Sequence, residues 1–214
     1  MPNLRWPVVL FDLDGTLANS IDLVIASYRA AFATIGRTVD RDVALHWIGE
    51  TLRQTFPREA PGHGPDMEVA YRAYFADHID QITGYPGVPD LLASLRDAGA
   101  VTGVVTAKKR EVALTTMRQA GVEGLIDLVG AMEDTTVHKP DPAPLLAAAA
   151  KLGVLPETCV YIGDATYDVM AAKGAGMAVI AVTWGAGLSD ELAALNPDAM
   201  AADAEELILR LRAG

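Results

Sequence analysis

Short apolar runs and longer amphipathic stretches alternate along most of the chain. The apolar runs predict strands over residues 8–13, 101–106, 126–131, 159–163 and 178–183. Between the last four runs, helical spacing of apolar residues predicts helices over 111–119, 143–152 and 168–173. Strands that alternate with helices are typical of a parallel sheet with crossover connections. The pattern therefore predicts an α/β fold.

One gap in this pattern, between the first two predicted strands, is too long for a single crossover helix. Residues 20–84 fall in this gap, and their apolar spacing predicts helical stretches over 21–35, 40–55 and 66–82. The stretch 57–65 is rich in Pro and Gly, which predicts a loop between the last two helices. We therefore expect a helical domain at 20–84, inserted into a sheet domain formed by 1–19 and 85–214.

Composition and charge narrow the class of protein. Hydrophobic residues make up 51% of the chain and charged residues 21%, which is typical of a folded domain. The net charge of -11 argues against nucleic-acid or membrane partners, and no apolar run is long enough for a membrane span or signal-peptide core. The single cysteine, Cys159, excludes an internal disulfide and agrees with a reducing compartment. We expect a cytoplasmic protein, monomeric or homodimeric.

Polar residues follow the ends of the predicted strands. Asp12 and Asp14 end the first strand, and Thr106 ends the second. Lys139 follows the third strand by a loop, and Asp164 follows the fourth. Because ligands of open α/β sheets bind outside the carboxyl ends of the strands, we expect these side chains to meet at one edge.

Four acidic residues would share that edge. Asp164 and Asp168 are spaced as neighbours on one helix face, and Asp12 and Asp14 would lie close to them. At about 5 Å and an effective dielectric constant of about 20, each ionised pair costs about 3 kcal/mol. A hard divalent cation relieves this repulsion, and Mg²⁺ fits carboxylate ligands and a phosphate oxygen best. The four histidines have no zinc-binding spacing.

The same edge would carry a fixed cation, Lys139, and the hydroxyl of Thr106. Together with acids and a metal ion, these groups are the parts used in phosphoryl transfer. Each motif alone has a plainer interpretation: a turn for Asp12 to Gly15, a helix start for Gly163-Asp164, and a solvated loop charge for Lys139. Their joint occurrence at strand ends favours a phosphoryl-transfer site.

Four stretches resemble the motifs of haloacid dehalogenase superfamily phosphatases. They are the DLDGT run at 12–16, Thr106 after an apolar strand, the HKP run at 138–140, and Gly163-Asp164 followed by Asp168. The likeness runs in order over nearly the whole chain. The insertion resembles the helical, C1-type cap of the phosphoglycolate phosphatase-like subfamily. The resemblance implies a Rossmann-like core, Mg²⁺ dependence and an aspartyl-phosphate intermediate.

The resemblance also implies roles for the acidic residues. Asp12 would be the nucleophile and a metal ligand. Asp14 would protonate the leaving oxygen, then take a proton from water, while its backbone carbonyl binds the metal. Asp164 would complete the metal site, and Asp168 would act through water or by supporting a ligand.

The phosphate-binding residues implied by the resemblance are Thr106, Ala107 and Lys139. Two positions depart from the family pattern: Ala107 stands where relatives often have asparagine, and Ala165 where Ser or Thr is common. Neither departure removes a charge, so we expect altered substrate contacts and retained chemistry.

A few residues indicate which reaction of the superfamily the chain catalyses and which substrate it uses. The second acid, Asp14, favours phosphate chemistry over dehalogenation, and Thr16, where phosphomutases commonly have valine, favours hydrolysis. Arg53 is a candidate to bind a second anionic group, although an exposed helical arginine is an equal interpretation. Segments 47–56 and 105–110 also resemble the pyrophosphatases of the subfamily.

We therefore expect a Mg²⁺-dependent phosphatase that hydrolyses a small, phosphoglycolate-like phosphomonoester. The alternatives are an inorganic pyrophosphatase of the same subfamily, then a sugar-phosphate phosphatase or phosphomutase. An alternative of another class is a catalytically silent protein that binds a metabolite or a partner.

Overall fold

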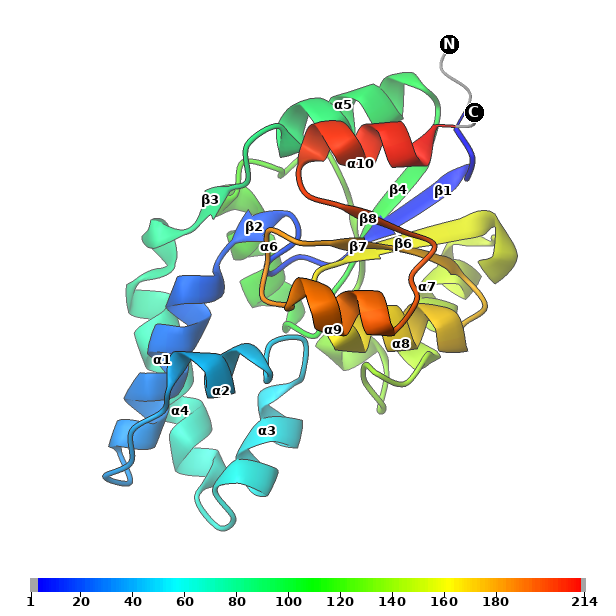
Figure 1. Ribbon diagram of the computed structural model, residues 1–214. Helices are drawn as coiled ribbons and strands as arrows, with labels where there is room; N and C mark the ends of the chain where they lie inside the picture. The colour runs from blue at the N-terminus through cyan, green and yellow to red at the C-terminus, as the bar shows by residue number, and fades with distance from the viewer. Residues whose placement is uncertain (1–3, 213–214) are drawn as a thin grey trace.

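A six-stranded parallel sheet forms the centre of the protein (Figure 1). The computed structural model describes residues 4–212. The strands are β1 (Val8–Phe11), β4 (Val101–Val105), β5 (Leu128–Gly130), β6 (Cys159–Gly163), β7 (Ala178–Val182) and β8 (Ala199–Ala201). Their order is β5-β4-β1-β6-β7-β8, so β1 lies between β4 and β6. The predicted α/β fold is confirmed.

All five predicted strands form, with small differences at their ends. The first ends at Phe11 instead of residue 13, and the third shortens to Leu128–Gly130. Strand β8, Ala199–Ala201, was not predicted, because its sequence Ala-Met-Ala contains no β-branched or aromatic residue.

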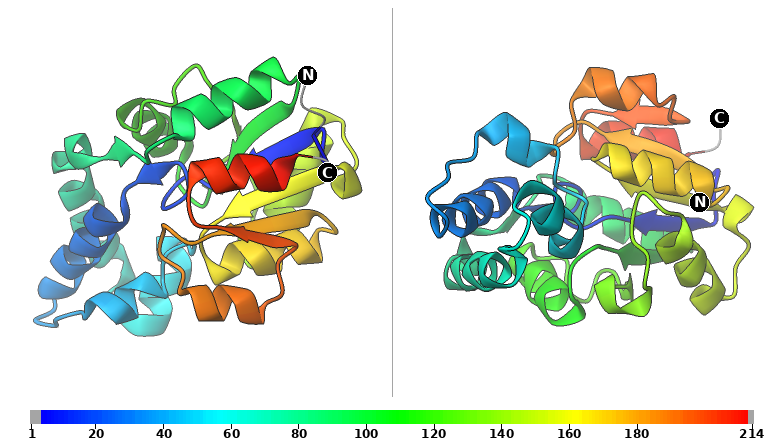
Figure 2. Two further views of the ribbon diagram at one scale, coloured as in Figure 1. Left: turned by 45° about the horizontal axis from the view of Figure 1, so that its top comes forward. Right: turned by 90° about the horizontal axis from the view of Figure 1, so that it is seen from below.

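Helices cover both faces of the sheet (Figure 2). On one face lie α5 (Val88–Asp97), α6 (Arg110–Gln119) and α10 (Ala204–Leu211); on the other lie α7 (Ala143–Leu152), α8 (Thr166–Gly174) and α9 (Ser189–Ala194). Strand β1 sends Val9 and Phe11 into the first apolar layer and Val8 and Leu10 into the second. Burial on both faces explains its continuous apolar run. Within residues 4–212, no helix has both the length and the apolar character to cross a membrane.

The inserted segment, residues 20–84, forms a group of helices beyond the carboxyl ends of the strands (Figure 1). Its helices are α1 (Ile21–Ala33), α2 (Arg41–Leu45), α3 (Leu52–Glu59), α4 (Gly64–Asp77) and the 3₁₀ turn η1 (Ile79–Gln81). Two further 3₁₀ turns, η2 (Met132–Asp134) and η3 (Pro156–Thr158), lie outside this segment. Tyr28 and Phe32 of α1 pack against Trp47, with ring centroids 5.2 and 5.3 Å away. This aromatic cluster is the core of the helical segment.

The single helix expected over residues 40–55 was a wrong prediction. Two short helices, α2 and α3, replace it, and a turn separates them. Gly49 in this turn has φ +99°, a left-handed conformation that ends helical geometry. Helix α3 then continues through Pro57 to Glu59, into the predicted loop. Pro57 lies near the end of this short helix, where the loss of one N–H hydrogen bond disturbs little of it.

A pair of short antiparallel strands connects the helical segment to the sheet. These strands, β2 (Ala18–Asn19) and β3 (Thr83–Gly84), lie at the predicted ends of the insertion. Gly84 lies against the end of α6, where a Cβ atom would be 2.4 Å from the Ala120 carbonyl oxygen. Only glycine fits this close approach. The division into a sheet domain and a cap domain stays a prediction.

We predict that Gly84→Ala lowers the free energy of unfolding by about 1–3 kcal/mol, because the new methyl group would overlap rigid backbone. Urea denaturation of the purified variant measures this loss. Gly64→Ala is the matched control, since its Cβ would meet only Phe56 Cβ at 3.8 Å. Equal losses in the two variants would contradict the proposed packing of the connection.

Candidate active site

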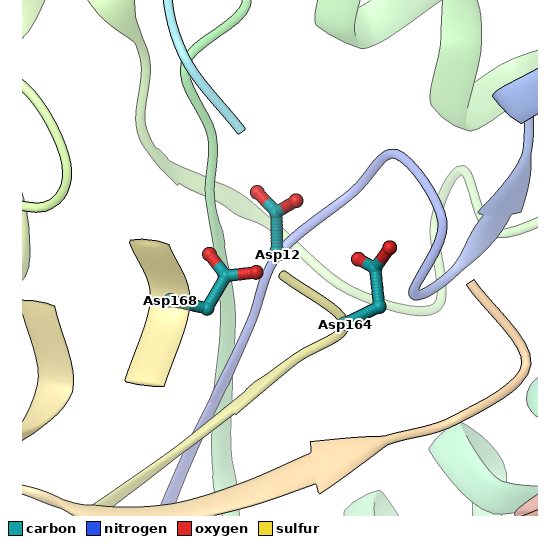
Figure 3. A group of neighbouring side chains, drawn as sticks. All are labelled: Asp12, Asp164 and Asp168. Carbon is teal, nitrogen blue, oxygen red and sulfur yellow. The ribbon is translucent and has the colours of Figure 1, made fainter. Parts of the chain in front are cut away.

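Three carboxylates meet at the carboxyl edge of the sheet (Figure 3). Asp12 follows β1, Asp164 follows β6, and Asp168 lies in the first turn of α8. One oxygen from each lies within 4.8 Å of the others. All three residues are buried, with exposed fractions of 4%, 0% and 0%. The fourth predicted acid, Asp14, lies two residues after Asp12 on the same loop but outside this group.

Asp164 is held by the loops around it. The Thr16 hydroxyl donates to Oδ1 at 2.8 Å, and the Ala186 backbone N–H donates to Oδ2 at 2.7 Å. A Cβ atom on Gly15 or Gly185 would lie 2.1 or 2.2 Å from Asp164 Oδ2. Both glycines are therefore needed so that the loops can close over the carboxylate.

Lys139 lies between two of the carboxylates. Its side chain is 2% exposed, and Nζ lies 2.9 Å from Asp12 Oδ1 and 2.6 Å from Asp168 Oδ1. The same Nζ is 3.2 Å from the hydroxyl of Tyr161 in β6. Asp168 also accepts the Ala165 backbone N–H at 3.0 Å through Oδ2. Both Asp168 oxygens therefore have partners, which suits a supporting position in the site.

Burial dominates the electrostatics of the cluster. It raises the pKa of Asp12 to about 7, against the opposing charge of Lys139. Burial, with Asp168 next in effect, raises the pKa of Asp164 well above its ordinary value. Burial would lower the pKa of Lys139, but Asp12 and Asp168 outweigh it and hold that pKa well above the usual range. The cluster thus holds three carboxylates and one ammonium, which contacts two of them, and its carboxylate oxygens fit a hard divalent cation.

Two of the predicted phosphate-binding residues lie at the end of β4. Thr106 is 6% exposed, and its backbone N–H donates to the Gly130 carbonyl at 3.1 Å. Its Oγ1 accepts the Lys108 backbone N–H at 3.2 Å, which folds the loop back on itself. Thr106 and Ala107 share a cavity wall with Asp12. The structure thus brings the predicted phosphate-binding residues to the edge that carries the acids.

A cavity of about 380 Å³ lies between this edge and the helical segment. The sheet side contributes Asp12, Asp14, Thr106 and Lys108 to its wall. The helical segment contributes mainly apolar and aromatic side chains, including Trp47, Tyr71 and Phe75. A ligand in this cavity would have the acids on one side and an apolar cover on the other.

Arg53 lies elsewhere. Its side chain is exposed on α3, and it is not among the residues that line the cavity. Its positive charge acts on His138. Burial has the larger effect in lowering the pKa of this imidazole, and the charge of Arg53 has the second. Its suggested contact with a second anionic group stays a prediction, without a place on the cavity wall.

Three residues of the site, Ser20, Lys108 and Tyr161, were not predicted from the sequence. The Lys108 ammonium lies 2.5 Å from each carboxylate oxygen of Asp14, and the Ser20 hydroxyl donates to Asp14 Oδ1 at 2.5 Å. Tyr161 donates to the Val105 carbonyl at 2.8 Å and contacts Lys139. In the sequence, Tyr161 has the pattern of a core residue of its strand, so nothing indicates a role in the site. For Lys108, the only sequence feature that indicates the site is its position two residues after Thr106.

The fold and this site define a class of hydrolase. The family model of haloacid dehalogenase-like hydrolases matches residues 9–182, and the chain belongs to this family. The resemblance found in the sequence is thereby confirmed, and the protein is a phosphatase of this family.

Relatives and solved structures cover almost the full chain. Pyrophosphatase PpaX of Bacillus velezensis is 34% identical over 97% of each chain, and that of Bacillus pumilus is 33% identical over 94% of each. A Lactobacillus plantarum structure with the provisional name phosphoglycolate phosphatase has a TM-score of 0.85 at 27% identity, covering 96% of this chain and 99% of its own. CbbY of Rhodobacter sphaeroides, solved with phosphate, has a TM-score of 0.80 at 25% identity, covering 95% and 96%.

We predict that Lys139→Met lowers the free energy of unfolding of the metal-free protein by about 3–5 kcal/mol at pH 8, because buried carboxylates lose their partner. The loss should shrink at pH 5, since Asp12 and Asp164, with raised pKa values, then hold protons. Urea denaturation at the two pH values measures both effects. Lys173→Met, at an exposed lysine of α8, is the control. Unchanged stability of Lys139→Met at pH 8 would contradict the buried ion pairs.

Proposed function

We propose that this phosphatase requires Mg²⁺ and cleaves a small phosphorylated substrate through an aspartyl-phosphate on Asp12. One observation carries the proposal: Asp12 belongs to a buried group of three carboxylates, and the Lys139 ammonium lies 2.9 Å from its Oδ1. The arrangement supplies a nucleophile, a fixed cation and an oxygen-rich metal site around one point. These are the groups that phosphoryl transfer needs.

The reaction takes place in two steps on one carboxylate. In the first, an Asp12 oxygen attacks phosphorus, the bond from phosphorus to the leaving oxygen breaks, and Asp14 gives that oxygen a proton. In the second, water attacks the same phosphorus, Asp14 takes a proton from it, and the bond to Asp12 breaks. Inorganic phosphate leaves, Asp12 is again a carboxylate, and Asp14 again carries its proton.

The other predicted site residues hold the phosphoryl group and the metal. Thr106, Ala107 and Lys139 would bind the phosphoryl oxygens, and Lys139 would also keep Asp12 ionised through its charge. Asp12, the Asp14 carbonyl and Asp164 would hold Mg²⁺, with Asp168 in support through Lys139. When bound, Mg²⁺ would neutralise charge on the phosphoryl oxygens.

We infer that residues 20–84 act as a cap domain over the site. Two contacts across the boundary support this role: the Tyr167 hydroxyl donates a hydrogen bond to the Glu50 carboxylate, and the Gln54 side chain donates one to the Lys139 carbonyl at 3.2 Å. The cap would exclude water from the cavity during the first step. The short strands β2 and β3 are the proposed hinge.

Two substrates agree best with these observations. Inorganic pyrophosphate is supported by the PpaX relatives at 33% and 34% identity. Phosphoglycolate is supported by the structural neighbour that carries this provisional name. Both substrates have a second anionic group beside the reacting phosphate. The single buried cysteine and the net charge of -11 support a cytoplasmic protein without nucleic-acid or membrane partners. A monomer or homodimer stays a prediction.

We predict that Asp12→Asn lowers kcat for p-nitrophenyl phosphate by about 10³-fold or more, because the amide cannot form the phosphoenzyme. Removal of divalent cations with EDTA should abolish activity in the wild type, and added Mg²⁺ should restore it. Asp22→Asn, at an exposed acid of α1, is the matched control. Full turnover in Asp12→Asn or in EDTA would refute the proposal, and no turnover in any form would favour a silent binding protein.

We also predict that Mg²⁺ binds about tenfold more weakly at pH 6 than at pH 8, because a bound cation competes with a proton. The pKa of Asp12 is raised to about 7, so Asp12 is mostly protonated at pH 6 and mostly ionised at pH 8. Calorimetric titration of the metal-free protein measures the affinity. In Asp12→Asn this dependence should weaken. An affinity that is equal at both pH values in the wild type would contradict the raised pKa.

A further inference from the structure

We propose that Lys108 is the specificity residue that binds a second anionic group of the substrate, a carboxylate or a phosphate, beside the leaving oxygen. The inference rests on the proposed function, in which Asp12 receives the phosphoryl group and Asp14 serves the leaving group. It replaces Arg53, which is exposed on α3 and away from the cavity wall.

The loop after β4 places Lys108 at the leaving-group side of the site. Its backbone N–H donates to Thr106 Oγ1 at 3.2 Å, so the proposed phosphate-binding hydroxyl and Lys108 belong to one turn. Its Nζ lies 2.5 Å from both oxygens of Asp14. A leaving oxygen that receives a proton from Asp14 must therefore pass close to the Lys108 ammonium.

The surroundings of Lys108 strengthen its interaction with an anion. Its side chain is 13% exposed, and Nζ lies 4.4 Å from the ring centroid of Phe75 in α4. The sheet loop and the cap thus enclose the ammonium together. A charged hydrogen bond is stronger in such a partly dry position than on an open surface.

The other cations near the cavity are less suited to this role. Arg72 is bound by Glu68 through Nε at 2.8 Å and Nη2 at 2.5 Å. Lys139 already forms ion pairs with Asp12 and Asp168. Lys109 lines the cavity one residue further on and is half-exposed. Lys108 combines a place on the wall, low exposure and contact with Asp14.

Charge explains why the site needs Lys108 for this class of substrate. Once Asp14 has given its proton to the leaving oxygen it is a carboxylate, and without a cation beside it that carboxylate would repel a second anion on the leaving group. The Lys108 ammonium has three N–H donors, so it can keep Asp14 as a partner and still donate to the substrate. A neutral leaving group gains nothing from this donor. Lys108 should therefore separate substrates by the charge of their leaving groups.

The test compares three substrates in matched variants. Lys108→Met should lower kcat/KM for pyrophosphate and phosphoglycolate about 30-fold more than for phenyl phosphate, mainly through a raised KM. Lys108→Arg should retain most of the preference. Lys109→Met, which removes the same charge from the adjacent position of the cavity wall, should leave the ratio unchanged. Circular dichroism and the Tm confirm that each variant is folded.

The outcomes separate the possible roles. A loss confined to one of the two substrates that carry a second anionic group supports the inference and identifies whether that group is a phosphate or a carboxylate. An equal loss on all three substrates overturns it, since Lys108 would then act only by holding Asp14. A ratio that shifts in Lys109→Met or Arg53→Ala, and not in Lys108→Met, also overturns it.

A binding experiment keeps this inference apart from the proposed function. If the wild type hydrolyses none of the three phosphates, the proposed function fails. Calorimetry with Mg²⁺ and the non-hydrolysable methylenediphosphonate then tests Lys108 alone. Lys108→Met should weaken binding about 30-fold relative to wild type and to Lys109→Met. Equal affinity in wild type and Lys108→Met would overturn the inference.

Discussion

The ammonium of Lys139 offsets the repulsion between the buried carboxylates of Asp12 and Asp168 at the carboxyl edge of the sheet. Its buried Nζ donates to Asp12 and Asp168, and the same nitrogen contacts the Tyr161 hydroxyl. These residues come from the loop after β1, from β6, from α8 and from the loop before α7. The charges at this point therefore tie four parts of the chain together. Asp164 keeps a raised pKa beside them, and the excess of negative charge at this edge favours a further cation.

Close packing around the acids sets the shape of the loops. A Cβ on Gly15 or Gly185 would overlap Asp164, and one on Gly163 would lie 2.4 Å from the Asp168 Cβ. These glycines bring the backbone against the carboxylates, where the Ala186 N–H can reach Asp164. The glycine in the DLDGT run thus has a steric role beyond turning the chain. It lets a loop after the central strand β1 touch an acid that follows β6.

Two lysines divide the positive charge of the site. Lys139 is buried and paired with Asp12, the proposed nucleophile, whereas Lys108 lies at the cavity wall and pairs with Asp14. The inner cation suits the phosphoryl group, which the two proposed substrates share. The outer cation touches Phe75 of the helical segment and so lies where substrates differ. Chemistry and selectivity would then depend on separate charges within one cavity.

The sequence by itself determined the α/β class, the five main strands, the helical insertion and the candidate acids. It could do so because apolar periodicity reports burial, and because parallel strands bring their carboxyl ends to one edge. The tertiary structure decided the break at Gly49, the outward position of Arg53, and the pairing of Lys108 with Asp14, 94 residues apart. Such contacts depend on the conformations of loops and the directions of side chains, and neither produces a periodic pattern in the sequence.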